Sequence, residues 1–297
     1  MFVRRSAASA AAYVALTAAA VLAALLAAGR GAGAQAPAAP PAPPDEPKQP
    51  ELVTDRPDFT ESAVVVPRRS VQVEGGVTVE RTGGVVARHA GELLVRLGVA
   101  RAAELRVGLN SYTSTLRTPG GGPHPHGLED ASVSVKLVLV SEARARGLVP
   151  TLGVLGGTTL ATGTGDVRET ALTPEAKLLA QWDLPAGWGL SGNLNASSAR
   201  CDDPACTSTR PDGTVRVRRR RGEVVASLSA DHPLGARLGG YAEVFGGRPA
   251  VGAGWQYANA GLTFAAAPLV QLDARVGRGL GGTRRDYFVG AGVSERF

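Results

Sequence analysis

Runs of alternating hydrophobicity recur through most of this chain and limit its fold more than any other feature. The last run is Tyr287-Phe-Val-Gly-Ala-Gly-Val-Ser-Glu-Arg-Phe297. Its apolar face consists of Tyr287, Val289, Ala291, Val293 and Phe297. Successive side chains of a β-strand point to opposite faces, so this period of two predicts a strand with one face in an apolar medium. Glu295 is the residue that fits this face least well.

Twelve such runs follow one another from residue 70, and no segment of comparable length after the N-terminal apolar stretch shows a helical period. The predicted strands are 70–81, 91–100, 103–111, 129–140, 148–160, 172–183, 187–198, 222–231, 235–246, 254–266, 269–278 and 286–297. Strands of globular proteins usually have about five or six residues. Ten residues tilted by about 45° span roughly 24 Å, the apolar height of a membrane barrel. The sequence therefore predicts an all-β protein, a transmembrane antiparallel up-and-down β-barrel of about 12 strands.

The connections between the predicted strands alternate in length. Most odd-numbered connections are long or polar, and most even-numbered ones are tight turns. Membrane barrels carry short turns on the periplasmic side and longer loops outside. An even number of strands also brings both ends of the barrel to the same side, so we expect the last strand to pair with 70–81.

The segment before the barrel divides into three parts. Arg4 and Arg5 precede a stretch rich in Ala, Leu and Val, and small residues follow up to Ala34, as in a secretory signal peptide. We therefore expect a signal peptide at 1–34, with a retained anchor helix as the alternative. Residues 35–50 are rich in Pro and Ala and are expected to form a disordered periplasmic tether. An N-terminal motif or plug segment at 51–69 precedes the barrel at 70–297.

Two stretches resemble the outer-membrane proteins of the putative MetA-pathway of phenol degradation family. They are Thr54-Asp-Arg-Pro-Asp-Phe-Thr-Glu-Ser62 and Gln271-Leu-Asp-Ala-Arg-Val-Gly-Arg-Gly-Leu280, the latter followed by the final strand. The resemblance implies a Gram-negative outer-membrane β-barrel with a transport role, for hydrophobic or aromatic compounds among others. A terminal Phe, here Phe297, resembles the signal read by the barrel-assembly machinery. Glu295 stands where such signals usually carry an apolar residue.

The 54–62 motif combines charges with a proline that restricts the chain. One interpretation is a plug that folds back into the barrel mouth, with Arg56 paired to lumen carboxylates. The other is a polar lead-in that solvates the periplasmic rim. The resemblance favours the plug, and its candidate residues are Asp55, Arg56, Asp58 and Glu61.

The polar strand faces carry charges of both signs. Such residues would cost about 2–4 kcal/mol each on the lipid face near mid-membrane, so we expect them to point inward. They would line a wet pore or pair with one another and fill a narrow lumen. The candidate lumen-lining residues are Glu74, Arg96, Glu104, Arg106, Lys136, Lys177, Glu243, Asp273 and Arg275.

The largest expected outer loop contains two further features. Cys201 and Cys206 are close in an exported chain, which predicts a disulfide; a metal site is the alternative. The basic run 216–221 suits phosphate groups of lipopolysaccharide, with a solvated strand extension as the alternative. The net charge of +6 owes much to this run, and nothing in the chain suggests nucleic-acid binding.

Few residues suggest catalysis. His124 and His126 lie in a Gly/Pro-rich loop without a nearby third ligand, so we expect no metal and no cofactor. His89 and His232 have no Ser at a spacing that recommends a hydrolase. The aromatic residues near predicted strand ends are expected at the membrane interface: Trp182, Trp188, Trp255, Tyr257 and Tyr287.

These observations predict an outer-membrane channel for passive passage of small molecules of unknown identity. Its partners would be outer-membrane lipids, lipopolysaccharide and the barrel-assembly machinery. The alternatives are a structural or surface-interaction barrel with a blocked lumen and, less favoured, an outer-membrane lipase that depends on His89 or His232.

Overall fold

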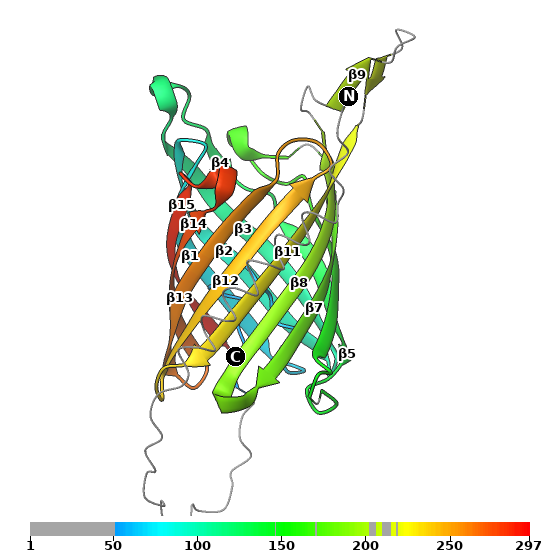
Figure 1. The fold of residues 1–297 in the computed structure, drawn as a ribbon, viewed down its shortest axis with the longest axis vertical. Helices are drawn as coiled ribbons and strands as arrows, with labels where there is room; N and C mark the ends of the chain where they lie inside the picture. Colours follow the sequence, from blue (N-terminus) through cyan, green and yellow to red (C-terminus); the bar gives the residue numbers. More distant parts are fainter. Residues whose placement is uncertain (1–50, 146, 170, 202–205, 210–214, 218) are drawn as a thin grey trace, which may run out of the picture. The chain divides into compact units, whose positions relative to one another are not determined.

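The computed structural model describes residues 51–297 except 146, 170, 202–205, 210–214 and 218. The expected signal peptide (1–34) and the expected tether (35–50) lie outside these residues. Twelve long antiparallel strands form a sheet that closes on itself, as Figure 1 shows. The predicted fold class is therefore confirmed. None of the helical turns in the described residues is long and apolar enough to cross a membrane.

The barrel strands match the predicted ranges closely, except in the second and third strands. They are β1 (Val71–Thr82), β2 (Val85–Ala100), β3 (Ala103–Arg117), β5 (Ser132–Val140), β6 (Thr151–Thr159), β7 (Thr173–Leu184), β8 (Trp188–Arg200), β11 (Arg220–Pro233), β12 (Leu238–Pro249), β13 (Trp255–Ala267), β14 (Val270–Gly279) and β15 (Tyr287–Arg296). A short strand, β4 (His126–Leu128), pairs with β3, and β9 (Thr207–Thr209) pairs with β10 (Val215–Val217) in the loop after β8. The remaining elements are short 3-10 turns: η1 (Pro119–Gly121), η2 (Gly165–Val167), η3 (Pro185–Gly187) and η5 (Gly281–Thr283).

The first and last strands close the cylinder. β1 pairs with β15 from Gln72 opposite Arg296 to Arg81 opposite Tyr287. The backbone of Phe297 extends this pairing by exchanging two hydrogen bonds with Val71, at 3.1 and 2.7 Å. The pairing expected between the two ends is therefore confirmed.

The two ends of the barrel carry different sets of connections. The turn end, where β1 begins and β15 ends, carries connections 101–102, 141–150, 185–187, 234–237 and 268–269. The opposite, loop end carries 83–84, 118–131, 160–172, 201–219, 250–254 and 280–286. In outer-membrane barrels the short turns face the periplasm.

The long first connection predicted at 82–90 is wrong. Gly83 and Gly84 form a two-residue turn with positive φ of 60° and 91°, which suits a hairpin between twisted strands. β2 then continues through a bulged region in which the register shifts between Ala90 and Leu93 and Glu92 has a φ of 42°. A bulge inserts an extra residue and breaks the alternation, so this part of β2 reads as a loop in the sequence.

The sheet has an apolar outer face and a polar inner face, the reverse of a water-soluble protein. Exposed side chains on the outer face include Val135, Leu137, Leu178, Leu272 and Val289. Fully buried side chains on the inner face include Arg96, Lys136, Gln72, Glu74 and Glu104. An apolar exterior around a polar interior is the pattern of a barrel whose outer surface faces lipid.

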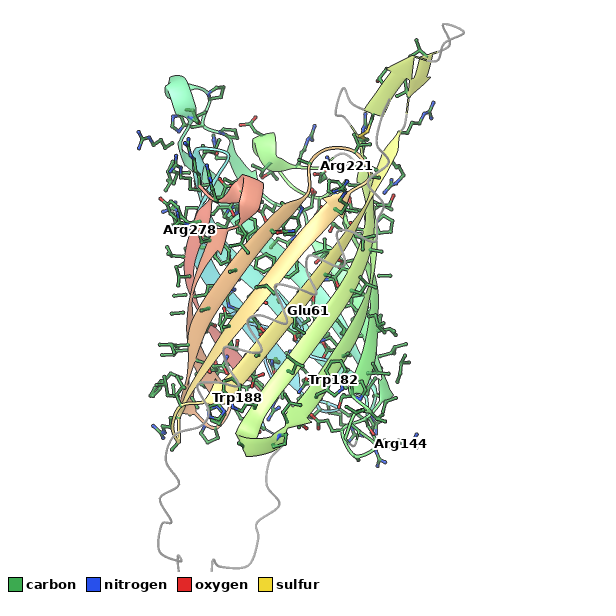
Figure 2. All side chains as sticks on the ribbon, viewed as in Figure 1. Glu61, Arg144, Trp182, Trp188, Arg221 and Arg278 are labelled. Carbon is green, nitrogen blue, oxygen red and sulfur yellow. A yellow bond between two sulfur atoms is a disulfide. The ribbon has the colours of Figure 1, made fainter. Side chains whose placement is uncertain are left out.

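The aromatic residues divide between interface and lumen. Trp182 and Trp188 lie near the turn end in Figure 2, and Tyr287 is exposed on the outer face. Trp255 and Tyr257 instead point inward and contact Phe245. The expectation of an interfacial position is wrong for these two residues, because β13 carries them on the same face as the buried Asn259.

Candidate functional site

The candidate site is the lumen, and residues 53–66, called the inner segment below, occupy its turn end. The segment leads directly into β1 through a turn in which Ser70 N–H donates to the Pro67 carbonyl at 3.0 Å. Its Ala63 is completely buried and packs with Leu155 and Leu179 of the wall. The chain passes so close to β2 that a Cβ at Gly98 would overlap the Pro67 carbonyl.

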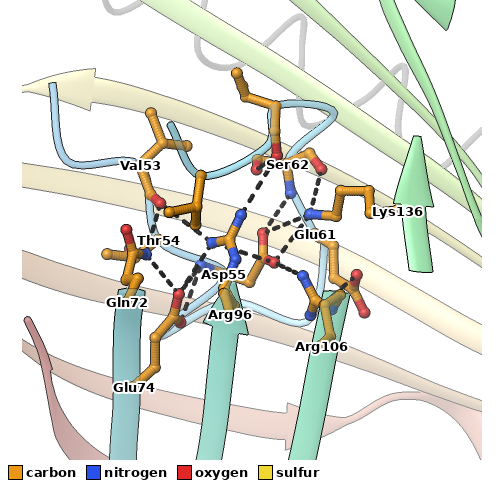
Figure 3. A network of polar contacts seen from close by, with 12 residues as sticks. Val53, Thr54, Asp55, Glu61, Ser62, Gln72, Glu74, Arg96, Arg106 and Lys136 are labelled. Atoms are coloured by element: carbon orange, nitrogen blue, oxygen red, sulfur yellow. Dashed lines mark hydrogen bonds and ion pairs between the residues drawn. The ribbon is translucent and has the colours of Figure 1, made fainter. Parts of the chain in front are cut away.

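Asp55 is surrounded by three cationic side chains from adjacent strands, as Figure 3 shows. Its carboxylate accepts from Lys136 Nζ at 3.0 Å and from Arg106, and lies 3.4 Å from Arg96. Its own backbone N–H donates to both carboxylate oxygens of Glu74, at 3.2 and 3.1 Å. Burial alone would raise the pKa of Asp55, but Arg96, Lys136 and Arg106 outweigh burial and hold this pKa well below its usual range.

Arg56 reaches the opposite wall. Its guanidinium donates to Glu92 at 2.6 Å and to Asp273 at 3.3 Å. Gly76 and Gly292 face each other across β1 and β15, and a Cβ on either glycine would overlap this guanidinium. Glycine at these two positions therefore leaves the space that the Arg56 guanidinium occupies.

Residues 58–60 are held by a single carboxylate of β12. Glu243 accepts from the backbone N–H groups of Phe59 (2.6 Å) and Thr60 (3.1 Å), and from the Thr60 hydroxyl (2.9 Å). Asn259 donates a further hydrogen bond to Glu243 at 2.6 Å. Burial and the nearby charge of Glu243 raise the pKa of Asp58 well above its usual range, against the opposing hydrogen bond from Ser229.

Glu61 anchors the inner segment to β7 and β3. Lys177 Nζ donates to it at 2.7 Å, and Arg106 lies 3.4 Å from its other oxygen. The Asn193 amide donates to the Glu61 carbonyl at 3.1 Å and accepts from its N–H at 2.7 Å. Burial acts to raise the pKa of Glu61, but Arg106 and Lys177 lower it to about 2.

A cavity of about 540 Å³, called the vestibule below, lies beyond the inner segment toward the loop end. Phe59 contributes to its lining, stacked on Phe245 at 4.4 Å with an interplanar angle of 7°. The rings continue through Tyr257 and Phe288, and Arg275 lies 5.4 Å from the Phe288 ring centre. A neighbouring hollow of about 430 Å³ shares Phe245 and Phe288. One wall of the vestibule is therefore aromatic.

Another part of the vestibule wall is polar. His89 Nδ1 lies 2.8 Å from the Thr113 hydroxyl and 3.0 Å from Glu129, while its Nε2 lies 3.4 Å from Glu80. The hydroxyl and Glu129 meet at the same ring nitrogen. In a Ser–His–Asp relay the hydroxyl faces Nε2 and the carboxylate faces Nδ1. Here the Thr113 hydroxyl faces Nδ1 and the carboxylate of Glu80 lies near Nε2, so this cluster does not have that geometry.

The comparisons with known proteins agree with this architecture. The family model described as "Putative MetA-pathway of phenol degradation" matches residues 54–297. The chain belongs to this family. It is an outer-membrane β-barrel, and the family resemblance carried by its two ends is confirmed.

Several solved structures are similar to this family member at low sequence identity. An outer-membrane channel from Pseudomonas putida F1 has a TM-score of 0.57 and 12% identity, over 79% of this chain and 98% of that chain. The KdgM porin in complex with disordered oligogalacturonate has a TM-score of 0.46 and 10% identity, over 76% and 99%. The translocator domain of the autotransporter NalP from Neisseria meningitidis has a TM-score of 0.47 and 13% identity, over 77% and 88%. No curated protein matches the sequence.

The structure places all nine candidate lumen-lining residues in hydrogen-bond or ion-pair contact with the inner segment. Glu74, Arg96, Arg106 and Lys136 contact Asp55; Lys177 contacts Glu61; Glu104 accepts from Val66 N–H; Glu243 accepts from Phe59 N–H; Asp273 contacts Arg56; and Arg275 donates to the Pro57 carbonyl. Three of the four candidate plug residues form ion pairs, and Asp58 faces Glu243 instead. Their role as a plug stays a prediction.

Several side chains of the site are uncharged, and the sequence did not predict their contacts. Gln72 donates to the Val53 carbonyl at 2.8 Å, and Gln271 donates to the Thr54 hydroxyl at 2.9 Å. Asn193 and the aromatic wall belong to the same group. Strand alternation would have placed these side chains inside, but a neutral side chain on an inward face gives no sign of its partner.

The loop after β8 contains the two cysteines and the basic run that the sequence analysis singled out. Cys201 and Cys206 form a disulfide. Of the basic run 216–221, Arg218 lies outside the described residues, while Arg219 and Arg221 are exposed or partly exposed. Arg220 donates to the Leu172 carbonyl at 2.8 Å and to the Ser198 hydroxyl at 3.1 Å. Contact of this run with lipid headgroups stays a prediction, as does the assembly role of the exposed Phe297.

Proposed function

We propose that the protein is an outer-membrane channel for passive passage of small hydrophobic or aromatic molecules, closed by its inner segment. The observation that carries the proposal is the charge match between segment and wall. A lead-in that only solvates the rim would have no reason to contact every charged candidate of the lumen.

On one side of the lumen the wall is basic. Four cations (Arg96, Arg106, Lys136 and Lys177) stand against three carboxylates, Glu74, Glu104 and Glu175, a surplus of one positive charge. Asp55 and Glu61 supply two negative charges. The inner segment therefore offsets the positive surplus of this wall.

On the other side the wall is acidic. Glu92 and Asp273 stand against Arg275, a surplus of one negative charge that Arg56 offsets. Unpaired charges of this kind are tolerated in a water-filled lumen and are costly in a dry one. The pattern supports a lumen that is dry when the inner segment is docked and wet when it has left.

The vestibule supports the cargo class. Stacked and edge-on aromatic pairs contribute about 0.5–1.5 kcal/mol beyond the area they bury. Phe245 and Phe288 present such faces beside Arg275, and Tyr257 continues the aromatic surface into the neighbouring hollow, so a planar apolar molecule entering from the loop end would meet a matching surface.

Planar-bilayer conductance tests the channel and its closure. A variant lacking residues 51–62 should conduct steadily, whereas the intact protein should conduct rarely. A deletion of equal length at 37–48 is the matched control and should behave like the intact protein. Conductance in none of the three proteins would overturn the channel, and equal conductance in all three would overturn the role of the inner segment.

A structural or surface-interaction barrel with a permanently blocked lumen is the second candidate. The dense contacts of the inner segment favour it, because they leave the turn end filled. The same experiment separates the two functions, since a structural barrel should give no cargo-dependent current in any variant. The cluster at His89 does not favour a lipase. His232 stacks on Trp188 at 4.5 Å.

A further inference from the structure

Four arginines gather on the outer surface of the barrel near the loop end. Arg81 of β1 lies opposite Tyr287 of β15, which in turn lies opposite Arg278 of β14, so the three residues stand side by side across adjacent strands. Figure 2 shows Arg278 near the loop end. Arg284 and Arg285, from the connection after β14, line the same hollow of about 690 Å³.

An apolar surface adjoins the arginines on the side toward the turn end. The next outward-facing row across the same strands consists of Val79, Val289 and Val276. Val276 and Tyr287 are 57% and 43% exposed. In the outer membrane, this row faces acyl chains while the arginine row lies at the level of the headgroups.

The four guanidiniums have no carboxylate partner within the described part of the chain. The one acidic side chain that borders the hollow, Asp286, is buried and accepts from Gly83 N–H at 3.0 Å, away from the surface. The arginines of the lumen differ: Arg56, Arg96, Arg106 and Arg275 each form ion pairs. The outer cluster therefore carries an uncompensated charge of about four units beside lipid.

The geometry points to a binding site for the phosphate groups of a lipopolysaccharide in the outer leaflet. Guanidiniums bind phosphate through paired, charge-assisted hydrogen bonds. The valine row gives the acyl chains of the same molecule an apolar contact. A soluble phosphate would gain nothing from that row, so the surface fits a phosphorylated lipid better than a free anion. The site is independent of the channel proposal.

Lipid binding to the intact purified protein tests the site. The probe is diphosphorylated lipid A in nanodiscs of neutral phospholipid, and native mass spectrometry counts the bound molecules. The combined variant R81Q/R278Q/R284Q/R285Q should bind roughly tenfold to a hundredfold more weakly, since neutral amides replace the guanidiniums that would donate charge-assisted hydrogen bonds to the phosphates.

The matched control removes four exposed arginines from the turn end, as R68Q/R101Q/R144Q/R237Q. It has the same net charge as the test variant and should bind like the original protein. Heat-dependent gel migration shows whether each variant is folded. Equal binding by the two variants would overturn the site.

Two further arms use the unsubstituted protein and so do not depend on a variant that folds. Lipid A without phosphates should bind as weakly as the test variant does. A large excess of inorganic phosphate should not displace the diphosphorylated lipid. Equal binding of the dephosphorylated lipid, or full displacement by phosphate, would contradict a lipid phosphate site.

Discussion

Charged side chains fill the lumen at the turn end, whereas aromatic side chains line an open cavity at the loop end. The same twelve strands build both regions, with the same alternation. The difference comes from the inner segment. Its charged side chains pair with the wall at the turn end, whereas its Phe59 lines the vestibule. A barrel of one strand number can thus hold a sealed and an open compartment in series.

The largest change in the difference between the two regions is expected from removing Asp55, the carboxylate at the centre of the sealed turn end. Asp55→Ala would remove one of the two carboxylates that Arg96, Arg106 and Lys136 share and would leave them only Glu104 in common. Removing one partner of a buried ion pair typically costs about 3–5 kcal/mol, so we expect the inner segment to leave the lumen. Conductance should rise, and a cysteine introduced as Ser62→Cys should become reactive toward a bulky maleimide.

The exposed Asp166 provides the control for this experiment. Asp166→Asn removes the same charge from a loop-end turn and should leave both readings unchanged. If Asp55→Ala leaves the channel closed and the introduced thiol protected from maleimide, the ion pairs do not hold the inner segment.

A smaller effect is expected at Phe59, where the two compartments meet. In a Trp182→Phe/Trp188→Phe background, Trp255 becomes the sole tryptophan. It lines the neighbouring hollow and contacts Phe245, so its fluorescence reports on the aromatic wall that the hollow shares with the vestibule. Phenol should change its fluorescence in a saturable way and cyclohexanol should not. Phe59→Ala frees the stacked face of Phe245, which should strengthen the phenol response roughly twofold to tenfold.

Phe264 is exposed on the outer surface and serves as the matched control, since Phe264→Ala removes a phenyl ring that faces lipid. It should not alter the phenol response. If cyclohexanol acts as strongly as phenol, the vestibule selects for apolarity and not for aromatic rings.

The smallest expected effect is a dependence of docking on pH. The pKa of Asp58 is raised in the docked state, so its contribution to docking is complete below its ordinary pKa of 3.8 and declines as pH rises above that value. The groups that act on Asp58 are Glu243, Ser229, Asp55 and Tyr241. Asp58→Asn should abolish this decline, as measured across pH by maleimide labelling of the thiol that Ser62→Cys introduces.

Asp55 and Glu61 act in the opposite direction. Their pKa values are lowered, so their contribution is present at neutral pH and is lost on acidification, for Glu61 between its ordinary value of 4.5 and about 2. A docking strength that rises steadily from neutral to alkaline pH would contradict the assignment at Asp58.

The sequence predicted the barrel well because a period of two is a local property. Each strand can be recognised without knowing its neighbours, and Tyr287–Phe297 alone shows the two faces. The prediction failed at His89 and Glu92, where bulges interrupt that period, and at Trp255 and Tyr257, whose inward direction depends on the register of β13.

The sequence predicted which charged residues face the lumen, but it did not predict which residues they pair with. Inward-facing charges such as Lys136 follow from the cost of placing them in lipid. Their partners do not follow, because Asp55 and Lys136 are 81 residues apart in sequence. The outer cluster at Arg81 and Arg278 depends on the closure of β1 against β15 and β14, so no local pattern indicates it.

The turn at Pro67–Ser70 has a consequence for the kinetics of closure. It joins the inner segment covalently to β1, so return of the segment to the lumen is an intramolecular step. A short flexible connection of this kind corresponds to an effective concentration in the millimolar range. A free peptide of the same sequence would compete only at comparable concentrations, and the rate of closure would not depend on how many copies of the protein the membrane contains.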